Sequence, residues 1–510
     1  MERAIKNKIL VLDGMVRKAA ALRREGKVVV QSHGIFDIVH PGIIRHLTEA
    51  KKLGNVLIVT VIKDKDVRRG PGRPIFPEQM RVENAASLWM VDYVCMVDDE
   101  TPFDCVKMIK PDVFAKGQTY HERDQKIHKK IFEAEKELYF GQTKIQETEG
   151  FSFSSSSIIN NFLDIYPDDT KAFLRKFSKK YDFKDIADTL NNIKDMKVLL
   201  IGDGIIDEYH YCDSMGKSAK APLVVSRYLA HEVFTGGAFA IANHVAGLCG
   251  KVHLVSLLGN HDSREDFIRK NLKPNIDAKF FYRDDGPTVI KKRYINQYLN
   301  QKLFEINYLS DSYIGGQMES DISAYIRSVM PGYDLVMVSD FGHGFITGGM
   351  IRAIEGHAGK LAVNTQTNSA NAGYNMITKY RRSNFICLDE PEIRLAAQER
   401  FANIEDVAKN MFNVLNTDCL VVTLGKKGAI AVSGNEDAVR TPIFSSKVVD
   451  TVGAGDAVFA FTAPIFASGA PLEMISFIGN AAGALAVQIV CNKKPIEKHE
   501  LLEFIHALLR

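Results

Sequence analysis

Short runs of aliphatic and β-branched residues alternate with amphipathic stretches along this chain. In the first 115 residues, the runs "KVVVQSHG", "VLIVTVI" and "VDYVCMV" are separated by "IIRHLTEAKKLG" and "PEQMRVENAASLW". Strands separated by helices of this length are typical of βαβ units with a parallel sheet. The pattern predicts an α/β domain over residues 26–160, preceded by an amphipathic helix at 1–25.

A second α/β pattern follows after a polar segment. Residues 161–195 are charged and have helical periodicity but few large apolar clusters, so we expect a helical linker there. Over residues 196–510, runs such as "KVLLIG", "YDLVMVSD" and "CLVVTLG" again alternate with helical stretches. The segment "GPTVIKKRYINQYLNQKLFEIN" interrupts this pattern and predicts a small β lid of antiparallel strands outside the main sheet.

Length, charge and cysteine usage narrow the class of protein. The 510 residues exceed what one hydrophobic core usually supports, and 65 basic against 62 acidic residues give no reason to expect nucleic acid or a membrane surface as partner. The seven cysteines occur singly, which fits a reducing compartment. The amino terminus mixes charges through its apolar positions, unlike a signal peptide, and no apolar run approaches the roughly 18 to 20 residues that span a bilayer. We expect a cytoplasmic enzyme or assembly factor.

The segment "HGIFDIVHPGIIRHL" is the first candidate site. Gly34 follows a predicted strand and precedes a predicted helix, a geometry in which backbone N–H groups and the helix amino end hold phosphate. The His40 imidazole lies where it could hydrogen-bond a phosphoryl oxygen as charge develops on it. The alternative is that His40 only caps the helix. One glycine and one histidine do not decide between the two.

Three motifs of this half together resemble the cytidylyltransferase-like nucleotidyltransferase family. They are "GIFDIVHPGI", similar to G-x-F-D-x-x-H-x-G-H, "IKPDVFAKGQTY" and "FSFSSSSIIN". The resemblance implies a Rossmann-like domain with Lys116 and Arg81 near the phosphates of a nucleoside triphosphate. It implies His40 as a catalytic residue, and as nucleotide-binding residues Gly34, Phe36, Lys116, Ser154, Ser155 and Ser156. ATP is the expected nucleotide and CTP the alternative.

One residue departs from the first motif. Ile43 stands where the family has its second histidine, and an aliphatic side chain cannot donate a hydrogen bond to a developing phosphate charge. Losing one such donor typically costs about 2.7 to 4 kcal/mol of barrier, or roughly 100- to 1000-fold in rate. Arg45 or His46, within one turn, could compensate. This half is therefore either a working transferase or a nucleotide-binding module.

The stretch "DTVGAGDAVFA" is the second candidate site. The glycines at 453 and 455 let backbone amides turn inward at a helix start, which forms a nest for a transferred phosphoryl group. Asp456 follows at once, within reach of an alcohol that is deprotonated as it attacks. A glycine-rich turn with an aspartate at the helix start is the alternative, and the whole stretch makes it less favourable.

This stretch resembles the D-T-x-G-A-G-D signature of the PfkB or ribokinase sugar kinases, and the likeness extends over residues 196–510. "LIGDGIIDEY", "TGGAFAIANHVAGL", "VMVSDFGHG", "LDEPE", "VTLGKKG" and "GNAAGA" resemble further segments of that family. The resemblance implies Asp456 as base and Gly453, Ala454 and Gly455 as anion hole. It further implies substrate contacts from Asp207, Gly236, Gly237 and Asn243, nucleotide contacts from Thr423, Gly425 and Asn480, and Mg²⁺ organised through water by Glu392.

Three residues depart from the kinase pattern. Asp389 stands in place of the asparagine of N-x-x-E, and His343 replaces the lysine that usually follows S-D-Y-x. Ala240 falls where the glycine segment has asparagine, so Asn243 is the substitute donor. These changes affect sugar recognition and metal affinity more than the base and its anion hole.

The two halves together resemble bifunctional enzymes that phosphorylate heptose 7-phosphate and adenylylate heptose 1-phosphate, with the order of the halves reversed. The resemblance makes Lys291, Lys292 and Arg293 of "TVIKKRY" candidates to meet a phosphate already on the sugar; a solvated basic strand is the equal alternative. The leading hypothesis is a sugar-phosphate kinase joined to a sugar 1-phosphate nucleotidyltransferase that makes a heptose-like nucleotide sugar for surface glycans. Its partners are a sugar phosphate, a nucleoside triphosphate and Mg²⁺.

Two alternatives stay open. In the first, only the kinase is catalytic, and the first domain binds or senses nucleotide. In the second, neither half catalyses a reaction; the intact glycine nest and Asp456 disfavour this alternative. The strands near 223–235 and 288–306 resemble a lid that pairs between subunits in related kinases, so a homodimer or higher homo-oligomer is expected.

Overall fold

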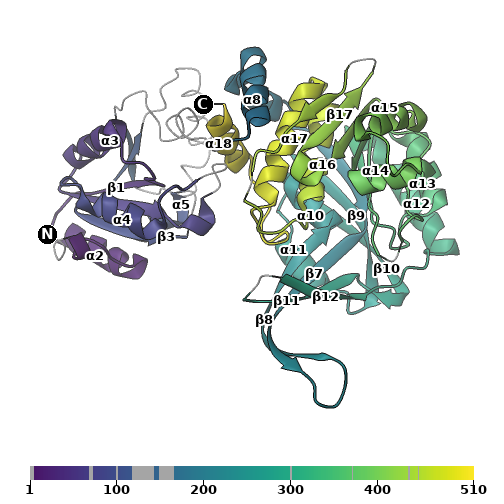
Figure 1. The fold of residues 1–510 in the computed structure, drawn as a ribbon, viewed down its shortest axis with the longest axis horizontal. Helices are drawn as coiled ribbons and strands as arrows, with labels where there is room; N and C mark the ends of the chain where they lie inside the picture. The colour runs from purple at the N-terminus through teal and green to yellow at the C-terminus, as the bar shows by residue number, and fades with distance from the viewer. Residues whose placement is uncertain are drawn as a thin grey trace. The chain divides into compact units, whose positions relative to one another are not determined.

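The computed structural model describes residues 5–67, 73–98, 102–117, 143–148, 166–298, 301–369, 371–434, 437–445 and 447–509. The chain forms two compact units, Met1–Ala187 with Leu502–Arg510 and Asp188–Leu501 (Figure 1). No helix in the described ranges has the length and apolar character needed to cross a bilayer.

The first unit is built on a five-stranded parallel sheet with the order β3-β2-β1-β4-β5. Its strands are β1 Val29–Gly34, β2 Val56–Ile62, β3 Tyr93–Val97, β4 Val113–Gly117 and β5 Lys144–Thr148. Its helices include α2 Leu12–Arg24, α3 Pro41–Lys52, α4 Glu78–Ser87 and α5 Phe103–Ile109. Every residue of β2 is buried, because helices cover both faces of a parallel sheet. The predicted Rossmann-like architecture is confirmed.

The position of β1 explains where a ligand fits this unit. The chain runs outward from β1 through β2 to β3 on one side and returns to β4 on the other, so the strand order reverses between β1 and β4. In open α/β sheets, ligands bind beyond the carboxyl ends of the strands at this switch point. Gly34 and Gly117 end these two strands.

The described part of the predicted linker and the last described residues of the chain are helical. The described part of the predicted linker contains α8 Asp168–Lys180 and α9 Phe183–Asn192, and α18 Lys498–Leu508 closes the described chain. The predicted helical character of the segment agrees with these helices. The predicted domain boundaries stay a prediction.

The second unit has a nine-stranded sheet with the order β10-β9-β6-β13-β14-β15-β16-β17-β18. The pairs from β10 to β16 are parallel, and β17 and β18 add antiparallel strands at one edge. The strands are β6 Lys197–Gly202, β9 Lys251–His261, β10 Ile276–Pro287, β13 Leu335–Asp340, β14 Leu361–Thr365, β15 Phe385–Asp389, β16 Cys419–Thr423, β17 Ala429–Ser433 and β18 Val439–Thr441.

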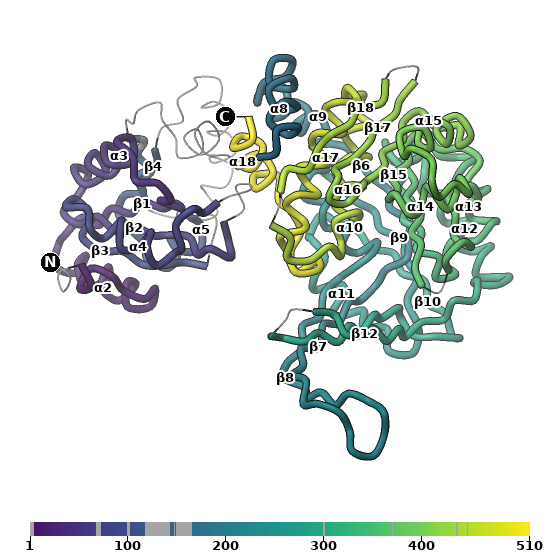
Figure 2. The backbone as a smooth tube through the Cα atoms, viewed as in Figure 1, coloured from purple at the N-terminus to yellow at the C-terminus, as the bar shows by residue number. Residues whose placement is uncertain are grey.

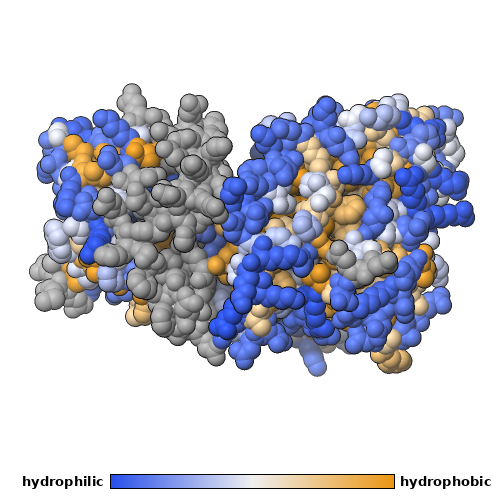
Figure 3. Space-filling model, turned by 90° about the horizontal axis from the view of Figure 1, so that it is seen from above, coloured by the Kyte–Doolittle hydropathy of each residue, from blue (hydrophilic) through white to orange (hydrophobic). Residues whose placement is uncertain are grey.

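Two groups of helices cover this sheet, one on each face (Figure 1). One group is α10 Ala238–Ala246, α16 Ala454–Ala467 and α17 Leu472–Ala486; the other is α12 Gly316–Val329, α13 Gly348–His357, α14 Glu390–Ala397 and α15 Ile404–Leu415. The short helix α11 Glu265–Asn271 joins β9 to β10. On the face seen in Figure 3, hydrophilic side chains predominate where the residues are coloured, with patches of hydrophobic side chains between them. This layered α/β arrangement agrees with the predicted fold class.

A separate four-stranded sheet, the lid, has the order β12-β11-β7-β8. It consists of β7 Gly204–Lys217, β8 Val224–Gly237, β11 Ile290–Asn296 and β12 Gln301–Tyr308. The far end of the β7–β8 hairpin projects away from the main sheet (Figure 2). The predicted lid is confirmed, with one difference: β11 pairs with β7 in parallel, because the chain passes through β8, α10, β9, α11 and β10 between these two strands.

Candidate active sites

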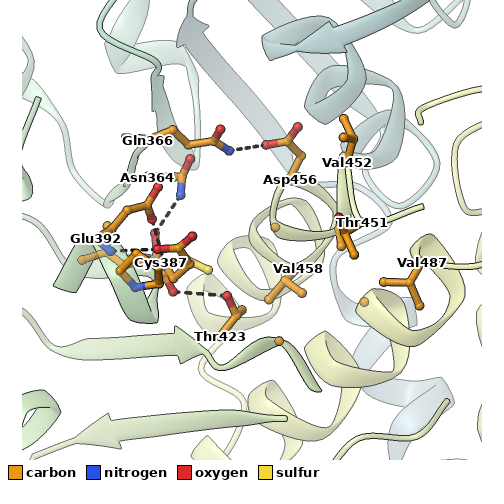
Figure 4. A pocket seen from close by; sticks show the side chains of 18 of the residues that line it. Asn364, Gln366, Cys387, Glu392, Thr423, Thr451, Val452, Asp456, Val458 and Val487 are labelled. Carbon is orange, nitrogen blue, oxygen red and sulfur yellow. Dashed lines mark hydrogen bonds between the residues drawn. The ribbon is translucent and has the colours of Figure 1, made fainter. Parts of the chain in front are cut away.

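A cavity of about 910 Å³ opens in the second unit between the lid and the carboxyl ends of the main-sheet strands. Lid residues such as Asp207 and Lys291 form one wall, and residues after β14, β15 and β16 form another. The amino end of α16 closes the cavity with the stretch around Asp456 (Figure 4). The lining residues extend from Ile205 to Asn492, so segments that lie far apart in the sequence meet at one site.

Asp456 lies in the first turn of α16 and is only 6% exposed. Gln366, which follows β14, donates a hydrogen bond from Nε2 to Asp456 Oδ1 at 2.7 Å (Figure 4). Burial, together with the negative charge of Asp207, raises the pKa of Asp456 to about 7, and the Gln366 bond opposes that rise. A carboxylate with such a pKa is well matched to accept a proton near neutral pH.

The predicted anion-hole residues Gly453, Ala454 and Gly455 all line the cavity beside Asp456. Gly453 caps α16 with φ +86°, a left-handed conformation that side chains disfavour, and a Cβ there would overlap the Asn492 side chain. The first amides of a helix lack intrahelical acceptors and carry its positive dipole end. This end of α16 is therefore suited to an anion.

The lid supplies the predicted acceptor residues. Asp207 is 4% exposed and accepts a hydrogen bond from Arg293 Nη1, while Arg293 Nε is 2.7 Å from Glu305 Oε2. A Cβ at Gly236 would overlap Asp207 Oδ2, so only glycine fits there, and Gly237 lines the cavity itself. Arg293 thus holds two carboxylates in place and is not an unpaired cation.

The three consecutive basic residues of β11 have different surroundings. Lys291 lines the cavity, is 9% exposed, and its Nζ lies 5.9 Å from the centre of the Phe341 ring. Within the described part of the chain, no carboxylate lies within ion-pair distance of it, and burial lowers its pKa. Lys292 points to the opposite face of the strand, 3.4 Å from Glu208. Lys291 is therefore the cation of this strand that is available to a ligand.

Asn243 differs from the expectation of a substrate contact. Its Nδ2 donates to the Asn271 carbonyl at 2.8 Å, and its Oδ1 accepts from the Lys273 amide at 3.0 Å. It lies outside the 910 Å³ cavity, in the helix α10 that packs on the main sheet. The amide therefore ties α10 to the segment after α11, and its polar atoms are used for structure.

The predicted nucleotide residues line the other end of the cavity. Thr423 ends β16 and donates to the Leu388 carbonyl at 3.5 Å; Gly425 follows with φ +56°. Asn480 on α17 donates from Nδ2 to the Pro442 carbonyl. Val448, Val458 and Val487 add apolar surface between them. This end therefore combines apolar surface with polar groups, as a nucleoside requires.

Glu392 and Asp389 form a capping box at the start of α14. Glu392 accepts from the Asp389 amide at 2.8 Å through Oε2 and from the Thr367 amide at 3.1 Å through Oε1. Burial and the neighbouring Asp389 charge raise the pKa of Glu392 to about 8. Each carboxylate oxygen keeps a second lone pair, which can accept a hydrogen bond from metal-bound water. The Asp389 carboxylate does what the family's asparagine could also do: it caps the helix.

In the first unit, the turn from Gly34 to His40 lies at the switch point of the sheet. Asp37 accepts hydrogen bonds from the amides of Ile75 and Phe76, and Phe36 is buried with φ +52°. His40 caps α3: its Nδ1 accepts from the Gly42 amide at 3.1 Å, and burial lowers its pKa. His40 therefore does cap the helix, as the alternative interpretation expected, and it does so through Nδ1. Nε2 is the ring nitrogen that could contact a ligand.

Of Arg45 and His46, the two residues considered as replacements for the missing histidine, His46 is already hydrogen-bonded within the fold. Ile43 packs against the core that includes Val30 and Val59. His46 uses both ring nitrogens inside the unit, 2.7 Å from Ser32 Oγ and 2.5 Å from Thr148 Oγ1, and burial lowers its pKa to about 4. The neutral imidazole of His46 therefore has both nitrogens hydrogen-bonded within the fold, and neither is left for a ligand.

Arg81 also differs from its expected place near the phosphates. It is fully buried, donates to the carbonyls of Ile35 and Ile62, and forms a 2.6 Å ion pair with Asp64. Its guanidinium therefore holds strand ends together. Lys116 lies near the carboxyl end of β4, next to Gly117. The predicted contacts from Ser154, Ser155 and Ser156 lie outside the described residues.

Gln366 and Asn364 are cavity residues that the sequence motifs did not identify. Asn364 lies within β14 and Gln366 directly follows it. Asn364 Nδ2 donates to the Cys387 carbonyl at 2.8 Å. The available signal was positional: polar residues at the carboxyl end of a parallel strand are where α/β proteins place ligand contacts.

Two family models, each matching one part of the chain, define a class: an enzyme with a carbohydrate-kinase domain and a cytidylyltransferase-like domain. The model of the pfkB family carbohydrate kinases matches residues 350–495, and the cytidylyltransferase-like model matches residues 32–161. In this chain the cytidylyltransferase-like match therefore precedes the kinase match.

Particular relatives share part of this chain. The bifunctional protein HldE of Trichlorobacter lovleyi is 25% identical over 309 residues, which is 60% of this chain and 62% of that protein. HldE of Koribacter versatilis is 26% identical over 334 residues, 63% of this chain and 66% of that protein. The chain therefore matches less than two thirds of the length of these relatives.

Solved structures of phosphofructokinase-2 resemble part of this chain in fold. The tetrameric inhibited form of phosphofructokinase-2 from Escherichia coli aligns with a TM-score of 0.51 at 15% identity, covering 62% of this chain and all of that one. The same enzyme in complex with substrates and products gives the same values. At this identity the likeness concerns the fold alone.

Proposed function

We propose that this chain is a bifunctional sugar-phosphate kinase and sugar 1-phosphate nucleotidyltransferase that makes a heptose-like nucleotide sugar for surface glycans. The observation that carries the kinase part is the cavity that brings Asp456, the α16 amino end and unpaired Lys291 together. The relatives named bifunctional protein HldE, which match this chain in part, support the pairing of two activities. As in the resembled heptose enzymes, ATP is the expected nucleotide, here with the halves in reversed order.

The kinase step uses groups that the cavity already holds. Asp456 takes the proton of an acceptor hydroxyl as its oxygen attacks the γ-phosphorus of ATP, and ADP leaves. The amides at Gly453 to Gly455 stabilise the charge on the transferred phosphoryl group. Asp207 orients the acceptor hydroxyls, and Lys291 binds a phosphate that the sugar already carries. The nucleoside lies toward Thr423, Gly425 and Asn480.

Mg²⁺ would be held through water by Glu392, with Asp389 beside it. Mg²⁺ usually keeps several waters and is bound by one or two carboxylates together with substrate phosphates. Such binding through water fits Glu392, whose two carboxylate oxygens each already accept one backbone N–H. When bound, it neutralises charge on the nucleotide phosphates. Among the described residues no cluster of three or more ligating side chains occurs, so the nucleotide would complete the coordination.

The nucleotidyltransferase step would take place in the first unit. The phosphate of a sugar 1-phosphate would attack the α-phosphorus of ATP, or of CTP, and pyrophosphate would leave. His40 Nε2 and the amides of the Gly34 turn are the groups for this step. A second function is favoured by Ile43 in the core and by His46 bonded on both sides: a kinase whose first domain only binds nucleotide.

One experiment separates these two functions. Purified protein is incubated with ATP or CTP and a panel of sugar 1-phosphates, heptose 1-phosphate first, and pyrophosphate is measured, with His40→Ala in parallel. Parallel reactions with sugar phosphates and free sugars measure ADP. Pyrophosphate release that depends on His40 supports the bifunctional enzyme. ADP formation without pyrophosphate release, together with nucleotide binding to the first domain, supports the kinase with a binding module.

We further propose that two copies pair through their lids. The lid carries exposed apolar side chains, with Tyr228 53% and Phe304 54% exposed, and a row of stacked rings runs across it from His231 through His210 and Tyr294 to Phe304. Sedimentation equilibrium tests this proposal. Phe304→Glu should shift the protein toward the monomer, whereas Phe401→Glu, at an exposed phenylalanine outside the lid, should not.

A further inference from the structure

His343 is a buried polar side chain at the cavity that the proposed reaction does not yet use. It is 2% exposed and lines the cavity, and neither Nδ1 nor Nε2 has a hydrogen-bond partner among the described residues. Leaving a buried polar group without a partner typically costs about 1–3 kcal/mol, so such groups in native folds call for an explanation. Two unpartnered nitrogens on one ring are hard to account for as packing.

The loop that carries His343 is held rigidly on both sides. Gly342 and Gly344 flank it with φ +70° and +85°, and a Cβ at Gly344 would overlap the Ser312 carbonyl. The Phe341 amide donates to Asp203 at 2.9 Å, and Arg283 donates to the carbonyls of Ser310, Ser312 and His343. The loop therefore holds His343 at the cavity wall without any side-chain hydrogen bond of its own among the described residues.

The electrostatic surroundings keep this imidazole neutral. Burial, followed by the positive charge of Lys291, lowers the pKa of His343 to about 3. A neutral imidazole has one N–H donor and one nitrogen acceptor, which matches a hydroxyl group that both accepts and donates. It cannot add a second positive charge beside Lys291, as a lysine at this position would.

We propose that His343 is a specificity residue of the acceptor site: it hydrogen-bonds a hydroxyl group of a sugar that carries one phosphate, while Lys291 binds that phosphate. The proposal rests on the kinase function above and narrows its substrate class. The acceptor is a monophosphorylated polyhydroxy sugar with a hydroxyl in reach of His343. Sugars that lack this hydroxyl are discriminated against, because the imidazole is then buried without a partner.

The test compares His343→Leu, which removes both hydrogen-bonding atoms, with His343→Asn, which keeps one donor and one acceptor. His357→Leu and His357→Asn, at an exposed histidine of α13, are the matched controls. The acceptors are heptose 7-phosphate, mannose 6-phosphate, fructose 6-phosphate and ribose 5-phosphate with their free sugars. Turnover is followed by ADP release, acceptor binding by calorimetry, and folding by the thermal midpoint.

The expected result is a change confined to the acceptor. His343→Leu should raise the KM and Kd of the best acceptor roughly 5- to 150-fold, the range for an unsatisfied buried group, with the KM of ATP unchanged. His343→Asn should recover most of the loss, and the His357 variants should match the wild type. A deoxy analogue lacking the critical hydroxyl should bind the wild type weakly, and His343→Leu should no longer distinguish it from the parent sugar.

Other outcomes overturn the proposal. The proposal is wrong if the KM and Kd of the acceptor in His343→Leu stay within twofold of the wild-type values. It is also wrong if the wild type binds every deoxy analogue as tightly as the parent sugar. If the leucine variant fails to fold, His343→Phe, which keeps the ring, takes its place, and the wild-type deoxy series still decides. Wild-type protein that binds phosphorylated sugars without turning them over would refute the proposed kinase and leave His343 to be judged by binding. Wild-type protein that binds none would refute both.

Discussion

Replacing Gln366 with leucine should move the pH dependence of the kinase, because this residue holds the proposed base. Gln366 Nε2 donates to Asp456 Oδ1 at 2.7 Å inside the fold, and the pKa of Asp456 is raised to about 7 despite this bond. A hydrogen bond to a charged group contributes about 1.5–3 kcal/mol, and about 1.36 kcal/mol corresponds to one pKa unit. Removing the bond therefore disfavours the carboxylate and raises the Asp456 pKa further, to roughly 8–9.

The expected size of the effect depends on pH. At pH 7, with a pKa of about 7, half of the wild-type Asp456 is ionised, whereas a pKa of roughly 8–9 leaves about 1–10% ionised. The value of kcat/KM at pH 7 should fall about 5- to 50-fold, and it should approach the wild-type value in strongly alkaline buffer. The sign follows from the role of Asp456, since a base is active only when deprotonated.

The assay is a pH profile of kcat/KM, measured by ADP release for the acceptor that the wild type prefers. Gln317→Leu is the matched control, because Gln317 makes the same amide-to-carboxylate bond, to Asp321 at 2.6 Å, at an exposed position of helix α12. The control should reproduce the wild-type profile. A Gln366→Leu profile with an unchanged midpoint refutes the reasoning, and so does an equal loss of rate at every pH, which would show that Gln366 does not act through the ionisation of Asp456.

Three further predictions follow from the sites. Asp456→Asn should abolish ADP release while retaining ATP binding. Because burial raises the folded-state pKa of Asp456, its ionised carboxylate destabilises the fold increasingly as the pH rises from 4 to 7. The variant should therefore have a higher thermal midpoint than the wild type above pH 7, and the two midpoints should converge below pH 4. Lys291→Met should raise the KM of sugar phosphates at least tenfold with little effect on free sugars, whereas Lys292→Met should leave both unchanged; equal effects of the two variants would remove Lys291 from the phosphate site. His40→Ala should reduce pyrophosphate release and leave ADP release intact, and an unchanged pyrophosphate rate would show that the first domain does not use this motif.

Much of the fold could be read from the chain because it depends on local patterns. The alternation of aliphatic runs with amphipathic stretches predicted two α/β units, and the segment containing "TVIKKRY" predicted strands outside the main sheet. Strand and helix periods arise from backbone geometry within a few residues, so they are visible without knowledge of the partners. The parallel pairing of β11 with β7 was not visible, because it depends on a crossover of more than 70 residues.

The candidate sites divide in the same way. The sequence by itself determined the nest of Gly453 to Gly455 and the adjacent Asp456, because a helix amino end and its first side chains are contiguous in the chain. Only the tertiary structure decided that Gln366 bonds Asp456 and that Lys291, but not Lys292, faces the cavity. These facts depend on strand order and register, which bring residues 90 or more positions apart within hydrogen-bonding distance.

The first unit shows what a motif leaves undecided. The segment "HGIFDIVHPGIIRHL" predicted a turn between a strand and a helix at Gly34, and the departure at Ile43 could be read directly. Neither the neighbours of Arg81 nor the partners of His46 could be read, since each bonds to strands elsewhere in the sheet. Residue chemistry is local, but whether a polar group remains available to a ligand depends on which other groups the fold packs against it.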